Sequence, residues 1–166
     1  MDDIMKQMSI NDALDNSILE DALIKMKNNS DDMNSLMELV QAFVERIRAA
    51  GGFILAFTNC SIESGVDNID FIERDTNFKG NVCGAPTNDG KEIGIAFTSK
   101  DKFEGQLPNF DSDKISGGIL MINTVLEFFT FDERFDGVVF NPGTDEVVMN
   151  KESLMGLVTM IGGAIK

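Results

Sequence analysis

The 166-residue chain has the length of one folded domain, and its 43% hydrophobic and 25% charged residues are typical of a globular protein. A net charge of −14 with no basic run argues against nucleic acid and anionic membrane surfaces as partners, because both attract clustered Lys and Arg. The absence of His excludes Ser-His and Cys-His nucleophile pairs as well as imidazole metal ligands.

Residues 1–16 are polar with scattered Met and Ile, and we expect them to form a flexible N-terminal arm. A single domain should follow over residues 17–166. Its first helix is predicted to begin at Ser17, where Glu20 completes a capping box. Helical spacing predicts that one side of this helix is apolar, formed by Ile18, Leu19, Ala22, Leu23 and Met26.

A second helix is predicted from about Asp31 to Ala50, where apolar residues recur every three or four positions. Gly51 and the glycine after it should end the helix, because glycine accepts a left-handed C-cap. Met33 and Met37 of this helix suit either the core or a soft binding groove, and the spacing favours the core.

Strands are predicted next. Phe53–Thr58 reads as a buried strand, and "NIDFIER" alternates like an edge strand. Asn81–Pro86 and Glu92–Ser99 should pair as a hairpin around Asp89-Gly90, whose two residues suit a turn with positive φ at both central positions. The two cysteines, Cys60 and Cys83, form no zinc pattern and are expected to be buried free thiols.

Helices dominate the remainder of the chain. Thr98 and Asp101 form a capping box that predicts a short helix, and the apolar run Ser116–Phe131 is predicted as a buried helix, with a strand at "ILMI" as the rival. Two short strands, "GVVF" and "EVVM", should precede a final helix capped by Asn150, with Leu154, Met155, Leu157, Val158 and Ile161 facing inward. The fold class is therefore α+β (mixed α/β), with a mixed sheet covered by two N-terminal helices and a C-terminal helix.

Acidic clusters are the candidates for metal-assisted chemistry. "NFDSDKISGG" offers Asp111 and Asp113, but it lacks the turn glycine and the final Glu of a calcium-binding EF-hand. "FDERFD" offers Asp132 and Asp136, with Arg134 as an internal counter-charge. A solvated connector is the favoured interpretation, and no cofactor is predicted.

The segment Asn141-Pro142-Gly143-Thr144 is the second candidate site. Pro presets φ and Gly accepts positive φ, so a type II turn between two strands explains the segment without a ligand. On that interpretation, truncation of Asn141 costs less than about 1 kcal/mol. The alternative is a small binding site in which Asn141 and Thr144 lie beside Thr98 and Ser99, where two strand ends meet.

These motifs resemble the N-terminal domain of the SseB (enhanced serine sensitivity) family. The family pattern has a strand ending in Phe-Thr-Ser, here Phe97 to Ser99, then a helix, and a strand ending in Asn-Pro-Gly, here Asn141 to Gly143. The resemblance covers roughly Gly51 to Leu157. It implies a cytoplasmic bacterial protein with an α/β sandwich-like fold, and it implies no reaction, since the family has no settled catalytic mechanism.

Together these features favour a non-enzymatic, cytoplasmic binding or regulatory module with a protein partner, whose oligomeric state the sequence leaves open. One alternative is an enzyme acting through a divalent metal held by Asp111, Asp113, Asp132 and Asp136. Another is an acidic chaperone for a basic or secreted client, because a strongly acidic surface suits a basic partner. No stretch is long enough to span a membrane, so no membrane partner is expected.

Overall fold

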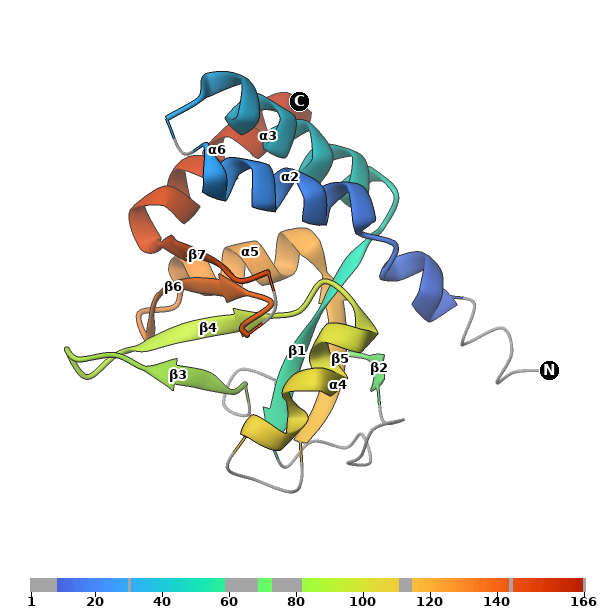
Figure 1. Ribbon diagram of the computed structural model, residues 1–166, viewed down its shortest axis with the longest axis vertical. Coiled ribbons are helices and arrows are strands. Elements are labelled where there is room, and N and C mark those ends of the chain that lie inside the picture. The colour runs from blue at the N-terminus through green and yellow to red at the C-terminus, as the bar shows by residue number, and fades with distance from the viewer. Residues whose placement is uncertain are drawn as a thin grey trace.

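The computed structural model describes residues 9–29, 31–58, 69–72, 82–110, 115–143 and 145–165, and Figure 1 shows their arrangement. The helices are α2 (Ser17–Asn28), α3 (Met33–Arg48), α4 (Lys100–Gln106), α5 (Ile122–Phe131) and α6 (Lys151–Ile165). The strands are β1 (Gly52–Thr58), β2 (Ile69–Phe71), β3 (Gly84–Pro86), β4 (Glu92–Ala96), β5 (Ile115–Met121), β6 (Phe135–Phe140) and β7 (Val147–Asn150). No helix in these ranges is both long and apolar enough to cross a bilayer.

The strands form two small mixed sheets that meet at β1 and β4. One sheet has the order β1-β5-β2 and the other β3-β4-β6-β7, and each contains one parallel and at least one antiparallel pair. Ile54 and Phe97 exchange both backbone hydrogen bonds at 2.9 Å, which joins the two sheets. The expected mixed sheet is thus confirmed, as is the α+β fold class.

Side-chain alternation along β1 divides the interior into two cores. Phe53, Leu55 and Phe57 point into a large core shared with α2, α3, α5 and α6, whereas Ile54 and Ala56 point into a smaller core that includes Phe103 of α4. Figure 1 shows the corresponding layers, with α2, α3 and α6 grouped on one side and α4 against β1 and β5 on the other. Both faces of β1 are buried, which explains its unbroken apolar sequence.

The stretch predicted as one buried helix over Ser116–Phe131 is a strand followed by a helix. Its first half is β5, which pairs with β1 along its whole length from Gly52↔Met121 to Thr58↔Ile115. A Cβ on Gly118 would lie 2.3 Å from the Phe57 ring, so the missing side chain makes room for that ring. The rival prediction of a strand at "ILMI" was closer to the structure. The helix prediction failed because a continuous apolar run has no periodicity that distinguishes a strand from a helix.

The positions of α2, α3, α4 and α6 are confirmed, but two predicted N-caps and one predicted turn type are wrong. Glu20 forms an ion pair with Lys102 at 2.5 Å, and α2 has no side-chain N-cap. The cap of α4 is Ser99 and not Thr98. The β3–β4 hairpin closes through Thr87, and only Gly90, with φ 84°, has the positive φ that was expected at both central residues.

The described part of the expected flexible arm packs on the domain. Residues 9–13 are helical, and both Ile10 and Ala13 are buried in the smaller core. Other apolar residues expected inside are exposed on the helices instead, namely Ile18 (70%), Met33 (64%), Met37 (51%) and Met155 (49%). These exposures correct the prediction that helical spacing alone places every such side chain in the core.

Candidate functional site

Two of the candidate polar residues meet where β4 and β6 end. These strands pair in parallel with Ala96 opposite Phe140, so Thr98 and Asn141 follow them side by side. Asn141 Oδ1 accepts the Thr98 backbone N–H at 2.9 Å, and Asn141 Nδ2 lies 3.0 Å from Thr98 Oγ1. Thr98 is 0% exposed and Asn141 only 2%, so the expected meeting occurs in the interior rather than on an open surface.

Asn16 and Arg46, which the sequence did not single out, extend this cluster. Asn16 is 1% exposed, and its Nδ2 donates to the carbonyls of Thr98 at 2.9 Å and Gly52 at 3.0 Å. Its Oδ1 accepts from Arg46 Nε at 2.9 Å, and Arg46 also donates to the carbonyl of Ala13 at 3.0 Å. The cluster therefore ties the start of α2 and the end of α3 to the sheets, and its polar atoms are used by the fold.

The neighbouring candidates also have structural roles. Ser99 Oγ accepts from Lys102 N at 3.3 Å and caps α4. Gly143 has φ 85°, as the third position of a type II turn requires, and Pro142 helps to line a cavity of about 260 Å³ beside Phe110. Thr144 lies outside the described residues.

The two acidic candidates that the structure describes, Asp132 and Asp136, have different bonding partners. Asp132 accepts from the Arg134 backbone N–H at 3.0 Å, and Asp136 lies 3.5 Å from Lys91 in a partly exposed ion pair. Asp111 and Asp113 lie outside the described residues. Within the described ranges no group of three or more potential metal-ligating side chains is found.

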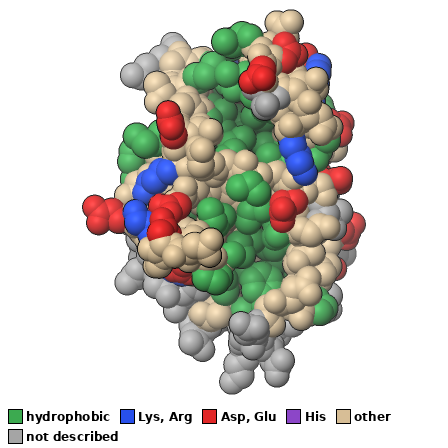
Figure 2. Space-filling view, turned by 60° about the vertical axis from the view of Figure 1, so that its left-hand side comes forward, with side chains coloured by type: hydrophobic (Ala, Val, Ile, Leu, Met, Phe, Trp, Pro, Cys, Tyr) green, Lys and Arg blue, Asp and Glu red, His purple; other side chains and the backbone are tan. Residues whose placement is uncertain are grey.

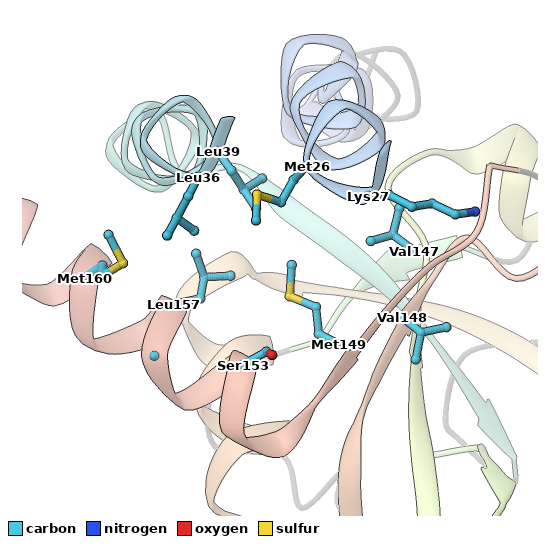
Figure 3. Close-up of a pocket in the computed structure, with 11 residues that line it drawn as sticks. Met26, Lys27, Leu36, Leu39, Val147, Val148, Met149, Ser153, Leu157 and Met160 are labelled. Atoms are coloured by element: carbon cyan, nitrogen blue, oxygen red, sulfur yellow. The ribbon is translucent and has the colours of Figure 1, made fainter. Parts of the chain in front are cut away.

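A surface groove of about 430 Å³ lies between α2, α3, β7 and α6, which come from opposite ends of the chain. Figure 3 shows Leu39, Leu157 and Met149 directed toward one another from three of these elements, while Val148 points away on the other side of β7. Figure 2 shows hydrophobic side chains gathered in a band on this side of the molecule, with charged side chains at its margins. The groove is lined by Met26, Lys27, Leu36, Leu39, Val147, Val148, Met149, Ser153, Gly156, Leu157 and Met160.

The groove is mostly apolar, and Lys27 is the one charged residue that lines it. Of the eleven lining residues only Lys27 and Ser153 have polar side chains, and Lys27 Nζ donates to the Glu146 backbone carbonyl at 2.5 Å. Glu146 and Glu152 directly precede the lining residues of β7 and α6, and both are exposed. Neither carboxylate forms an ion pair with a residue in the described ranges.

Such a groove suits the binding of apolar side chains rather than acid–base chemistry. Met26, Met149 and Met160 supply unbranched, polarizable side chains that adapt to the shape of a partner. The sequence raised a methionine groove only for the helix over residues 31–50, where Met33 and Met37 prove to be exposed and are not among the lining residues. The ten methionines were the one feature of the sequence that pointed to this groove. No local sequence pattern shows that α2, α3, β7 and α6 come together.

The one free thiol in the described ranges, Cys83, is half-buried and lies outside the groove. Burial raises the pKa of Cys83, so the thiol stays protonated and weakly nucleophilic near neutral pH. Its environment is that of a structural cysteine.

Comparisons of this chain with protein-family models, curated proteins and solved structures find no match. The resemblance to the SseB family therefore stays a prediction, carried by its own short motifs. Function has to be argued from the geometry of the surface, because a fold class by itself assigns none.

Proposed function

We propose that this chain is a non-enzymatic, cytoplasmic protein-binding module, and that it binds an α-helical segment of another protein in the groove between α2, α3, β7 and α6. The observation that carries the proposal is the groove itself, about 430 Å³ lined almost entirely by apolar side chains. Helix-in-groove recognition uses such surfaces, because an amphipathic helix buries its apolar face there.

The polar candidates support this choice because their side chains are engaged elsewhere. Thr98 and Asn141 bond each other in the interior, and Ser99 caps a helix. Asp132 and Asp136 are bonded to Arg134 and Lys91 and do not belong to a larger acidic group in the described ranges. A metal-assisted reaction therefore has less support than binding.

The test uses synthetic helices because the natural partner is unidentified. A fluorescein-labelled peptide of about 18 residues (five turns), with Leu along one face and Gln on the other, is titrated with the protein. Fluorescence anisotropy should report saturable binding. A matched peptide with Ala in place of Leu should bind at least about tenfold more weakly, because it buries less apolar surface.

Two phenylalanine variants of α6 locate the binding site. Gly156 lines the groove and Gly162 does not, and a Cβ at either position would have no atom within 4 Å beyond the neighbouring residues and backbone of its own helix. Gly156→Phe should weaken the Leu peptide at least about tenfold by filling the groove, whereas Gly162→Phe should leave binding within about twofold. Both variants should remain as stable as the parent, because glycine is a poor helix former. Saturable binding that Gly156→Phe leaves unchanged, or no binding of any helix, would refute the groove as the site.

A further inference from the structure

We infer that the cavity beside Pro142 is a second binding site, which takes an extended peptide segment. The segment places one apolar side chain in the cavity and bonds its backbone to Gln106 and Asn109. This cavity of about 260 Å³ lies between the β3–β4 hairpin, the end of α4 with the 3₁₀ helix Leu107–Asn109, and the turn after β6. It shares no lining residue with the groove between α2, α3, β7 and α6, so the inference goes beyond the proposed function and does not depend on it.

The walls of the cavity are uncharged. Their apolar part comes from Ala85, Pro86, Ile95, Phe110 and Pro142. None of the eight lining residues carries a charge, although 25% of the residues in the chain are charged. A charged ligand group would lose its water there without gaining a counter-charge, so the cavity favours an apolar side chain.

Gln106 and Asn109 supply the polar side chains among the eight lining residues. Asn109 Nδ2 donates to Gln106 Oε1 at 2.9 Å, which leaves Gln106 Nε2 as a donor and Asn109 Oδ1 as an acceptor. Neither of these two atoms has a hydrogen-bond partner in the described part of the chain. Turning both amides over would again leave one donor and one acceptor for a ligand.

Gly143 leaves room for the Gln106 amide at the turn after β6. A Cβ on Gly143 would overlap Gln106 Nε2, so the missing side chain is what allows this amide to lie against the turn. The Gln106 amide is therefore held by Asn109 and by the Gly143 backbone before any ligand arrives. Such preorganisation lowers the entropic cost of binding.

The remaining donor and acceptor match one residue of an extended peptide. In an extended chain the N–H and C=O of the same residue point to the same side, as they do in the hydrogen-bonded pairs of an antiparallel sheet. A single trans amide directs its N–H and C=O to opposite sides, so a small molecule with one amide satisfies one of the two groups. A peptide can also run past the cavity along β3, which is the edge strand of its sheet and whose residues line the cavity (Figure 1).

The test is a titration of the isotope-labelled protein with the blocked peptide acetyl-Gly-Gly-Leu-Gly-Gly-amide, followed by two-dimensional amide NMR spectra. We expect saturable shifts of the Gln106 and Asn109 side-chain signals and of the Ala85 backbone signal. Ala in place of the peptide's Leu should bind at least about fivefold more weakly, because less apolar surface is buried. Lys or Glu in that place should give no saturable shift of these signals.

An ester analogue isolates the backbone contact. Replacing the Leu N–H of the peptide with oxygen removes a donor and keeps the side chain, so binding should weaken about three- to tenfold. Asn109→Leu removes the polar group from the protein with a side chain of similar size, and it should bring amide and ester to within about twofold of each other. Asn88→Leu makes the same change at an exposed asparagine outside the cavity and should leave the preference for the amide unchanged.

Each contrary result overturns a stated part of the inference. Equal binding of amide and ester by the parent protein would refute backbone recognition, and with it the extended peptide as the ligand. Saturable shifts that leave Gln106, Asn109 and Ala85 unaffected, or no saturation with the Leu peptide, would refute the cavity as the site. Gly156→Phe should leave this binding unchanged while it weakens helix binding in the groove, so failure of the inference and failure of the proposed function are separate observations.

Discussion

Asn16 and Asn141 show how much a single buried amide contributes to this fold. The sequence placed Asn16 at the end of a flexible arm and Asn141 in a turn. Each is nevertheless at most 2% exposed and bonded to Thr98, which lies 82 residues from Asn16 and 43 from Asn141 along the chain. Buried amides with such partners specify one arrangement of the elements, because every alternative arrangement leaves polar atoms unsatisfied. Arg46 completes this arrangement by holding the orientation of Asn16.

We predict that Asn141→Ala destabilises the protein by about 2–5 kcal/mol. The variant leaves the buried Thr98 N–H without its acceptor, at a cost of about 1–3 kcal/mol. It also places alanine at φ 55°, where left-handed backbone costs roughly 1–2 kcal/mol more. Urea denaturation measures the total loss in the free energy of unfolding. This expected loss is larger than the cost below about 1 kcal/mol that follows if Asn141 is only a turn residue.

Asn141→Gly is the matched control for backbone strain. It removes the same side-chain hydrogen bonds but tolerates positive φ, so it should cost roughly 1 kcal/mol less than the alanine variant. An alanine variant within about 1 kcal/mol of the parent would mean that the Asn141–Thr98 bond contributes nothing to stability.

At the scale of elements, α3 ends in the left-handed C-cap that the sequence predicted, but Ala50 and not a glycine has the left-handed backbone. Gly51 N donates to Arg46 O at 2.7 Å and Ala50 N donates to Ile47 O at 3.1 Å, which is the Schellman pattern. The left-handed residue is Ala50, with φ 59°, and not the glycine that follows it. The left-handed conformation therefore falls one residue before Gly51, which would adopt it without strain.

Ala50→Gly should consequently stabilise the protein by about 0.5–1 kcal/mol, because relief of the left-handed strain exceeds the added flexibility of the unfolded chain. Ala49→Gly is the control. Ala49 has φ −86°, so glycine brings no relief there and should cost roughly 0.5–1 kcal/mol. The two midpoints of urea denaturation should move in opposite directions, and a destabilised Ala50→Gly variant would contradict the strain at this C-cap.

At the scale of the whole molecule, the absence of His governs the response to pH. Without His, no side chain has an ordinary pKa between 6 and 8, so we predict that the free energy of unfolding changes by less than about 1 kcal/mol over this range. A change of that size corresponds to a shift of about 0.7 pKa unit in one group. The raised pKa of Cys83, caused by burial, keeps that thiol protonated throughout this range. Denaturation at several pH values in constant salt provides the measurement.

Below pH 6, stability should fall as the solution becomes more acidic. A hydrogen bond from the Ser35 hydroxyl lowers the pKa of Asp32 below its ordinary 3.8, and a hydrogen bond from the Thr87 hydroxyl does the same for Asp89. A carboxyl whose pKa is lower in the folded state stabilises the fold above its unfolded pKa. That contribution is lost as pH falls from about 4 through the folded pKa. A larger change between pH 6 and 8 would reveal a group with a strongly shifted pKa and would favour an enzymatic role.

The sequence by itself determined what depends on composition and on neighbouring residues. The lack of His, the acidic charge, the α+β class and the positions of α3, the β3–β4 hairpin and the β6–β7 hairpin follow from residue type and short-range periodicity. Helix caps were predicted less accurately, because Glu20 pairs with Lys102 instead of completing a capping box and Thr98 bonds Asn141 instead of capping α4.

Tertiary structure alone decided the features that depend on distant contacts. β5 is a strand because β1, more than fifty residues earlier, supplies its hydrogen bonds and because Gly118 admits the Phe57 ring. The candidate polar site became part of the interior when the parallel pairing of β4 with β6 brought Thr98 to Asn141. The groove likewise has no local signature, since α2 and α3 on one side of it and β7 and α6 on the other come from opposite ends of the chain. Local periodicity reports which side of an element is apolar, whereas only packing decides which apolar residues remain uncovered.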